Sequence, residues 1–228
     1  MSYFHKTEKK RKMDFSRAKQ NMIDSQLRTW DIIDQRVLDT FLLLDRQDFV
    51  PPKFKELSYA DVEIPIGFNQ TMLTPKLAGR LIQEIEINSS DRILEIGTGT
   101  GYLTTILSYL GGDVVSFEIN PELHKTASII MDKHTQGNVR LELGDGLQEV
   151  SGQDYDAIVL TGSLPAIPDF MKNKLAKSGR MIGVFGTHPI MSAILISRLK
   201  NSLFDEAKIF ETCISPLAEA DAKPEFIF

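Results

Sequence analysis

The sequence contains very little cysteine: Cys213 is the single one among 228 residues. One cysteine excludes an internal disulfide and any metal cluster built from cysteines. We expect Cys213 to lie in a late strand as a small, buried, apolar residue. The chain also has few histidines, and they are scattered without the spacing typical of metal ligands, so we predict no metal site. They are His5, His124, His134 and His188.

Long apolar runs are absent as well. No stretch of about 18 apolar residues occurs, and the sequence therefore predicts no membrane-spanning helix. The first residues are polar and charged and lack the apolar segment of a signal peptide. A reducing, cytoplasmic setting is the resulting expectation.

An excess of basic charge is the third absence. The chain has 26 Lys and Arg against 31 Asp and Glu, with a formal net charge of −5. This balance argues against a nucleic-acid partner bound through a broad basic face. A local basic cluster lies within residues 1–12, which we expect to be a flexible extension. Residues 13–228 are long enough for one domain, which we divide into N-terminal helices with a substrate or lid loop (13–76) and a cofactor-binding core (77–228). The oligomeric state stays open.

The most informative stretch runs from Arg92 to Leu103 and reads RILEIGTGTGYL. An apolar strand leads directly into Gly97, Gly99 and Gly101, and a helical pattern follows at once. Alternating glycines between a strand and a helix allow a sharp turn and a close approach of the backbone to a ligand. A dinucleotide-binding fingerprint would have its third glycine at position 102, where this chain has Tyr102. The stretch therefore predicts a nucleotide-type pocket of another kind.

A second acidic strand end supports this prediction. The buried strand Asp113–Phe117 ends in Glu118, roughly 20 residues beyond the glycines, the offset at which an acid reaches ribose hydroxyls. A carboxylate can accept two hydrogen bonds from a vicinal diol. We therefore predict that Glu118 binds a ribose.

The order of apolar patterns predicts an α/β fold. Helical patterns at 15–30 and 33–45 precede a breaker-rich loop at 59–75, and Pro75 then begins another helix. Strands are expected at 93–96, 113–118, 139–143, 155–161 and 180–185, with helices at 121–134 and 168–176. A closing antiparallel pair is expected at 193–199 and 208–214. The prediction is a seven-stranded, mostly parallel, Rossmann-like sheet with helices on both faces and an N-terminal helical appendage.

The pattern E-x-G-x-G-x-G that begins at Glu95 is similar to motif I of S-adenosylmethionine-dependent methyltransferases. Several further segments resemble the protein-L-isoaspartate O-methyltransferase family more specifically. The discriminating one is the loop Pro65-Ile66-Gly67 with Gln70-Thr71 and Pro75. The resemblance covers most of the chain, from about position 18 to about position 217. It implies a methyltransferase that uses S-adenosyl-L-methionine and acts on isoaspartyl protein or peptide.

The resemblance also implies roles for individual residues. An acid such as Glu95 suits the ammonium of the cofactor or its ordered water, and the acid-glycine turn Asp145-Gly146 borders the adenine. The cofactor-binding residues implied are Glu95, Gly97, Thr98, Gly99, Gly101, Glu118, Ile119, Asp145, Gly146 and Thr161. Gln70, Thr71 and Thr74 are implied for the substrate, and Thr71 and position 73 for the reacting centre.

Two positions depart from the family pattern, which reads roughly PIG-x-GQTIS-x-P. Asn69 replaces the second glycine, a mild change because asparagine tolerates a left-handed backbone. Leu73 replaces the serine and removes a hydrogen-bond donor from the reacting centre. This leaves three interpretations open: carboxyl methylation of an isoaspartyl protein or peptide, methylation of a different acceptor such as a small molecule, and a non-catalytic cofactor-binding relative.

Overall fold

The computed structural model describes residues 13–150, 152, 154–200 and 203–220. The basic cluster expected to be a flexible extension, within residues 1–12, lies outside the described residues. A seven-stranded sheet with the order β5-β4-β3-β6-β7-β8-β9 forms the centre of the fold. Strands β3 to β7 pair in parallel, and β8 and β9 form an antiparallel pair at one end of the sheet. The predicted fold class is confirmed.

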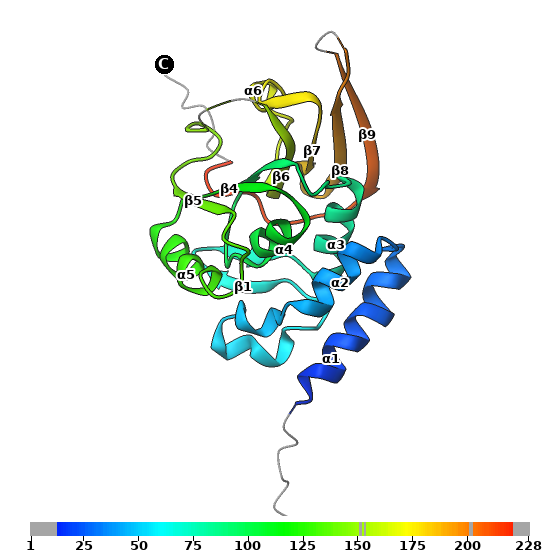
Figure 1. The fold of residues 1–228 in the computed structure, drawn as a ribbon, viewed down its shortest axis with the longest axis vertical. Coiled ribbons are helices and arrows are strands. Elements are labelled where there is room, and N and C mark those ends of the chain that lie inside the picture. Colours follow the sequence, from blue (N-terminus) through cyan, green and yellow to red (C-terminus); the bar gives the residue numbers. More distant parts are fainter. Residues whose placement is uncertain (1–12, 151, 153, 201–202, 221–228) are drawn as a thin grey trace, which may run out of the picture.

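The strands of the sheet are β3 (Arg92–Ile96), β4 (Asp113–Glu118), β5 (Val139–Leu143), β6 (Tyr155–Leu164), β7 (Leu175–Thr187), β8 (Ile190–Arg198) and β9 (Phe204–Glu211). The α-helices are α1 (Phe15–Met22), α2 (Gln35–Leu43), α3 (Pro75–Glu84), α4 (Tyr102–Leu110), α5 (Pro121–Met131) and α6 (Asp169–Lys172). The helices α1 and α2 lie at one end of the molecule, and β8 and β9 extend at the opposite end (Figure 1).

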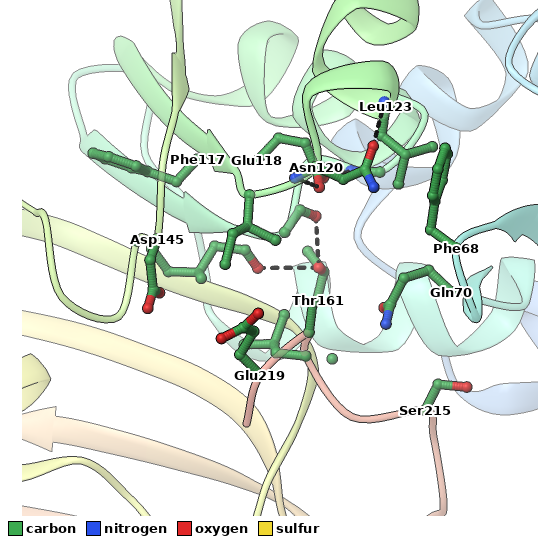
Figure 2. Close-up of a pocket in the computed structure, with 18 of the residues that line it drawn as sticks. Phe68, Gln70, Phe117, Glu118, Asn120, Leu123, Asp145, Thr161, Ser215 and Glu219 are labelled. Atoms are coloured by element: carbon green, nitrogen blue, oxygen red, sulfur yellow. Dashed lines mark hydrogen bonds between the residues drawn. The ribbon is translucent and has the colours of Figure 1, made fainter. Parts of the chain in front are cut away.

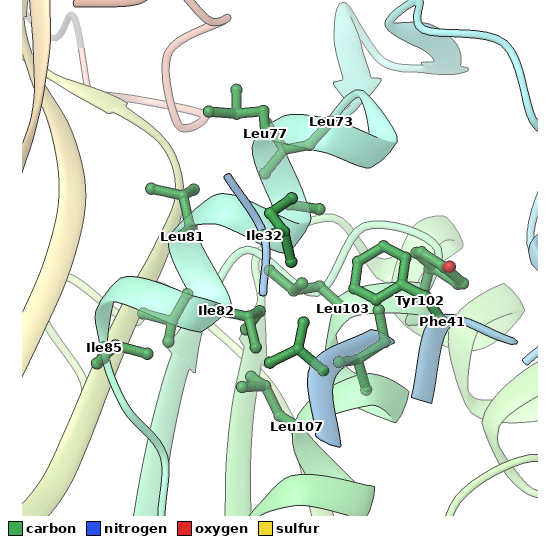
Figure 3. Packing of buried hydrophobic residues seen from close by; sticks show 14 of the residues in the cluster. Ile32, Phe41, Leu73, Leu77, Leu81, Ile82, Ile85, Tyr102, Leu103 and Leu107 are labelled. Carbon is green, nitrogen blue, oxygen red and sulfur yellow. The ribbon is translucent and has the colours of Figure 1, made fainter. Parts of the chain in front are cut away.

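Each face of the sheet carries its own hydrophobic cluster, because side chains alternate along a strand. In β3, Ile93 belongs to the cluster that α2, α3 and α4 cover, whereas Leu94 and Ile96 belong to the cluster on the other face. Figure 3 shows the first cluster, in which Phe41 of α2 packs against Tyr102 of α4 with ring centroids 6.0 Å apart. Helix α6 contributes Met171 to the second cluster. Burial on both faces explains why these strands are nearly continuous apolar runs.

The N-terminal helices begin where the sequence predicts. Asp14 caps α1 and Asp34 caps α2, each side chain accepting a hydrogen bond from a backbone N–H of the first turn. The helical pattern predicted for 15–30 is one helical run in three parts, since a π-turn (Ile23–Leu27) and a 3₁₀ turn (Arg28–Trp30) follow α1. Trp30 at its end packs against Phe210 of β9, with ring centroids 5.4 Å apart.

The breaker-rich loop contains a small hairpin of β1 (Ile64–Gly67) and β2 (Gln70–Met72). Phe68 and Asn69 are the two central residues of its turn, and both have positive φ, of 52° and 57°. Two left-handed residues are typical of a type I′ turn, which matches the twist of paired strands. Asn69 therefore has a left-handed backbone, which asparagine tolerates better than most residues.

Three sequence predictions are wrong. The strand expected at 208–214 is β9, which spans Phe204–Glu211. Cys213 is exposed and follows β9 instead of lying buried within a strand. Its Sγ donates a hydrogen bond to the carbonyl oxygen of Pro189 at 3.3 Å. The helix predicted for 168–176 ends at Lys172, because Leu175 already begins β7, where it pairs with Tyr155 and is fully buried.

The outermost strands of the sheet are β5 and β9. Charged side chains are two of the five in β5, which reads VRLEL, and four of the eight in β9, which reads FDEAKIFE. Within the described part of the chain, no helix is long and apolar enough to cross a membrane. The same residues contain no group of three or more His, Cys, Asp or Glu arranged to hold a metal ion.

Candidate active site

A cavity of about 260 Å³ opens at the carboxyl ends of the parallel strands (Figure 2). Open α/β sheets bind their ligands at this edge. The cavity is bounded by the turns after β3, β4 and β5, by β6, by the β1–β2 hairpin and by the segment that follows β9. Among the residues predicted from the sequence, the lining includes Gln70, Thr71, Leu73, Gly97, Gly99, Glu118, Ile119, Asp145, Gly146 and Thr161.

The glycine turn after β3 brings the backbone to the cavity wall. Gly97 has a φ of +96°, and a Cβ there would collide with Oγ1 of Thr161. That hydroxyl donates a hydrogen bond shared between the carbonyl oxygens of Ile96 at 3.0 Å and Gly97 at 2.6 Å. The turn thus depends on glycine both for its conformation and for its close contact with β6. Gly101 lies outside the lining and forms the N-cap of α4, with a φ of +81°.

The Glu118 carboxylate is held by backbone N–H groups at the edge of this cavity. Its Oε2 accepts from Gly99 at 2.8 Å and its Oε1 accepts from Asn120 at 3.0 Å. Burial raises the pKa of Glu118 above its ordinary value, and the two N–H groups partly offset this effect. Each carboxylate oxygen has about two acceptor positions, so each keeps one for a ligand. Two free acceptor positions on one carboxylate match the two donors of a vicinal diol, and the contact with a ribose stays a prediction.

The Glu95 side chain lies on the face of β3 that α4 covers, and it is not part of the cavity lining. Its Oε2 accepts hydrogen bonds from Thr104 of α4 at 2.5 Å and Ser116 of β4 at 2.6 Å. Ser116 in turn accepts from Thr98 of the glycine turn at 2.6 Å, so a chain of hydroxyls connects Glu95 to that turn. Glu95 is fully buried, and burial raises its pKa to about 7. The predicted contact of Glu95 with the cofactor stays a prediction.

The predicted substrate residues divide between two places. Gln70, Thr71 and Leu73 line the cavity. Thr71 Oγ1 lies 3.0 Å from Oε2 of Glu63 and 3.2 Å from Oγ of Ser215. Thr74 lies outside the lining and is the N-cap of α3, where its hydroxyl accepts from the backbone N–H of Leu77.

Leu73 is only 8% exposed and belongs to the hydrophobic cluster that α2, α3 and α4 cover. It also lines the main cavity and a second cavity of about 50 Å³ that lies beside it. The two cavities share Ile66, Thr71, Gly97, Gly99 and Thr161 as well as Leu73, and Thr98 lines the smaller one. Position 73 is therefore at the junction of the cavities, and its side chain makes that junction apolar.

Sequence reasoning missed several lining residues. Phe68, at the hairpin tip, and Leu123 of α5 both line the cavity (Figure 2). Ser215 and Glu219 come from the segment after β9, which is held by backbone hydrogen bonds between Ser163 and Ser215 and between Leu217 and Ser163. No local motif marks this segment, because only the return of the chain to the sheet edge brings it to the cavity.

The chain matches the family model described as protein-L-isoaspartate(D-aspartate) O-methyltransferase over residues 17–219. It is 31% identical over 204 residues to a protein-L-isoaspartate O-methyltransferase of Koribacter versatilis, covering 89% of this chain and 91% of the relative. A relative of the same name from Gloeobacter violaceus is 36% identical over 167 residues, with 73% of this chain and 82% of the relative covered.

The fold is also that of a solved structure from Plasmodium falciparum. That protein is described as a protein-L-isoaspartate O-methyltransferase in complex with S-adenosyl-L-homocysteine. The TM-score is 0.74 at 21% identity, and the match covers 91% of this chain and all of the other. With the family match over residues 17–219 and relatives above 30% identity, this chain belongs to the protein-L-isoaspartate(D-aspartate) O-methyltransferase family.

Proposed function

We propose that this protein is an S-adenosyl-L-methionine-dependent methyltransferase that methylates the free carboxylate of isoaspartyl residues in proteins or peptides. Membership of the family supports the reaction, and the relatives named above share that description. The observation that carries the proposal is the Glu118 carboxylate, which two backbone N–H groups orient at the cavity edge. We further propose that the enzyme acts in the cytoplasm, where an exposed thiol such as Cys213 stays reduced.

The residues present fit the proposed cofactor. Both oxygens of Glu118 keep an acceptor position, as two ribose hydroxyls require. The glycine turn brings backbone to within reach of the ligand, and Phe117 and Leu147 provide apolar surface beside Gly146. Asp145 accepts hydrogen bonds from the Leu147 N–H at 2.8 Å and the Gln148 amide at 2.7 Å, which fix the turn that we assign to the adenine. The assignments of Ile119, Thr161, Gly97 and Gly99 to the cofactor are part of this proposal.

The chemistry asks little of the protein. When bound, the cofactor would supply a methyl group on a sulfonium, whose carbon would form a C–O bond with a carboxylate oxygen while the C–S bond breaks and its electron pair stays on sulfur. A carboxylate is already ionised at neutral pH, so no general base is needed. The residues of the chain must bind and orient the acceptor and exclude water. Leu73 and Phe68 contribute apolar surface for the last of these tasks.

The test is methyl transfer from labelled S-adenosyl-L-methionine to a short isoaspartyl peptide and to its aspartyl twin. The proposal expects transfer to the first peptide and at most a trace to the second. Calorimetry with S-adenosyl-L-homocysteine measures cofactor binding separately. NAD is the control and should not bind, because Tyr102 stands where a dinucleotide-binding fingerprint has its third glycine. Cofactor binding without transfer to the isoaspartyl peptide would leave a cofactor-binding protein and reject the proposed acceptor.

A further inference from the structure

Arg46 is a buried cation beside the acceptor end of the cavities. It lies in the short 3₁₀ turn Arg46–Asp48, and only 1% of its surface is exposed. Its Nη2 donates a 2.6 Å hydrogen bond to the carbonyl oxygen of Leu73, the residue at the position of the family serine. Its Nε has no hydrogen-bond partner among the described residues.

The charge of Arg46 is not balanced by a neighbouring acid. Among the described residues, no ion pair joins it to a carboxylate, and the adjacent Asp45 pairs with Lys19 at 2.7 Å instead. Its guanidinium lies 4.8 Å from the ring centroid of Tyr102, a contact that offsets only a small part of the desolvation of a full charge. Buried charges are normally paired, so an unpaired one points to a missing anion.

Tyr102 presents a second donor without a partner. Its hydroxyl is buried and donates no hydrogen bond within the described part of the chain, and the neighbouring Arg46 guanidinium opposes the rise that burial causes in its pKa. Burial raises the pKa of Tyr102 to about 12, so the hydroxyl keeps its proton and remains a donor. Burying a hydroxyl without a partner is unfavourable, and native structures seldom leave two such donors side by side.

Both residues line the smaller cavity of about 50 Å³. This volume is enough for a few water molecules and therefore for the three heavy atoms of a carboxyl group. The cavity meets the main one at Thr71, Leu73 and Gly97, which line both. An acceptor bound in the main cavity would thus reach the two donors past Leu73.

We infer that Arg46 and Tyr102 together bind the carboxylate that is methylated. The inference rests on the function proposed above and names the residues that recognise its substrate. A guanidinium can bind a carboxylate through two parallel N–H···O bonds. Burial lowers the pKa of Arg46 below its ordinary value, and a bound carboxylate would oppose that shift. Leu73 itself offers no side-chain hydrogen-bond donor, so Arg46 and Tyr102 are the donors that this chain places beside position 73. Methylation removes the negative charge, which ends the ion pair and favours release of the ester.

A simpler reading gives Arg46 a structural role alone, in which its hydrogen bond holds the backbone of Leu73. The two readings differ in what the side chains recognise. A structural role predicts that loss of Arg46 lowers stability and weakens every ligand alike. A carboxylate-binding role predicts that the loss is specific to ligands that carry the charge.

The experiment measures binding of two peptides to the enzyme loaded with S-adenosyl-L-homocysteine. One peptide contains an isoaspartyl residue, and the other is identical except that a carboxamide replaces its free carboxylate. We expect the wild type to prefer the carboxylate by about 10- to 100-fold, the usual effect of charge-assisted hydrogen bonds. Arg46→Met should abolish this preference, and Arg46→Lys should retain only part of it. Tyr102→Phe should reduce it about 3- to 10-fold.

Tyr102→Phe guards against a failure to fold. It removes only a buried hydroxyl without a partner, so its melting temperature should equal or exceed that of the wild type. Arg180→Met is the matched arginine control: Arg180 donates to the Ile85 carbonyl at 2.7 Å and Asp91 at 2.6 Å, outside the cavity linings. That variant should lose stability and keep the preference for the carboxylate.

The outcomes separate the inference from the proposed function. If the wild type methylates the isoaspartyl peptide while Arg46→Lys and Tyr102→Phe both keep the full preference, the inference is overturned and the function stands. If the wild type neither methylates the peptide nor prefers the carboxylate, the function and the inference both fail.

Discussion

The Glu118 carboxylate accepts a 2.8 Å hydrogen bond from the backbone N–H of Gly99. The acid predicted to bind the ribose is therefore held directly by the predicted glycine turn. Two motifs that are about 20 residues apart in the sequence form one unit in space. Glu118, Gly97 and Gly99 line the same cavity, and the next predictions separate the contributions of the acid and the turn.

Glu118→Ala should weaken S-adenosyl-L-homocysteine binding by at least about tenfold, because a hydrogen bond to a charged group contributes about 1.5–3 kcal/mol. Isothermal calorimetry measures this directly. Glu122→Ala is the control, since Glu122 is an exposed acid at the start of α5 and should leave the affinity unchanged. Equal affinities for Glu118→Ala and the wild type would show that the acid does not contact the ligand.

Gly97→Ala should destabilise the protein and weaken cofactor binding together. The new Cβ would meet Thr161 in addition to requiring a φ of +96°. Gly137→Ala serves as control, because Gly137 has a φ of +77° and open space around it. The control should cost about 1–3 kcal/mol of stability for the left-handed backbone alone and keep the affinity. Thermal melts with and without S-adenosyl-L-homocysteine distinguish the two; similar ligand-induced shifts in both variants would contradict the prediction.

Glu95 should make stability fall as pH rises. Its folded pKa of about 7 exceeds the ordinary value of 4.5, so between these values the folded state holds a proton that the unfolded state has lost. Stability is then highest below pH 4.5 from this group and declines up to about pH 7, by about 3 kcal/mol in all. Glu95→Gln should remove that decline and be the more stable protein at pH 8. Urea unfolding at several pH values measures the free energy of unfolding of both proteins. The same dependence of that free energy on pH in the wild type and in Glu95→Gln would refute the prediction.

The same variant tests the predicted contact of Glu95 with the cofactor. Glutamine keeps an acceptor for Thr104 and Ser116 but loses the charge that an ammonium would recognise. An unchanged affinity of Glu95→Gln for S-adenosyl-L-homocysteine would mean that Glu95 supports the glycine turn through Ser116 and Thr98 only.

Leu73→Ser should increase kcat/KM for the isoaspartyl peptide by up to about 100-fold, since it adds an oriented donor where the cavities meet. It should also lower stability by about 2–5 kcal/mol, as loss of a buried leucine does. Leu77→Ser provides the matched control, because Leu77 is buried in the same cluster outside both cavities. That control should lose stability and gain no activity. A gain in neither variant would make Leu73 an ordinary packing residue.

The succession of strands along the chain and the glycine turn could both be predicted from the sequence. Buried parallel strands are apolar runs, and a backbone with positive φ favours glycine. The alternation of side chains along β3 also determines the face of the sheet on which Glu95 lies. Ile93 and Glu95 lie on one side of the strand and Leu94 and Ile96 on the other, which directs Glu95 toward α4.

Arg46 could not be predicted in the same way. It lies in the polar stretch Asp45-Arg46-Gln47-Asp48, which is typical of an exposed turn. Its burial depends on Leu73 and Tyr102, which are distant in the sequence and meet it only in the folded chain. The end of the helix predicted for 168–176 failed for a related reason, since pairing of Leu175 with Tyr155 outweighs local helical preference.

The charged outer strands β5 and β9 have a consequence for how the protein behaves at high concentration. An outermost strand offers unpaired backbone groups to which a strand of another molecule can add. The outer strand β9 carries the charged residues Asp205, Glu206, Lys208 and Glu211. On β5, Arg140 forms an ion pair with Glu142 at 2.9 Å. An incoming strand would have to desolvate these charges. The sheet is thereby protected against edge-to-edge aggregation at both of its ends.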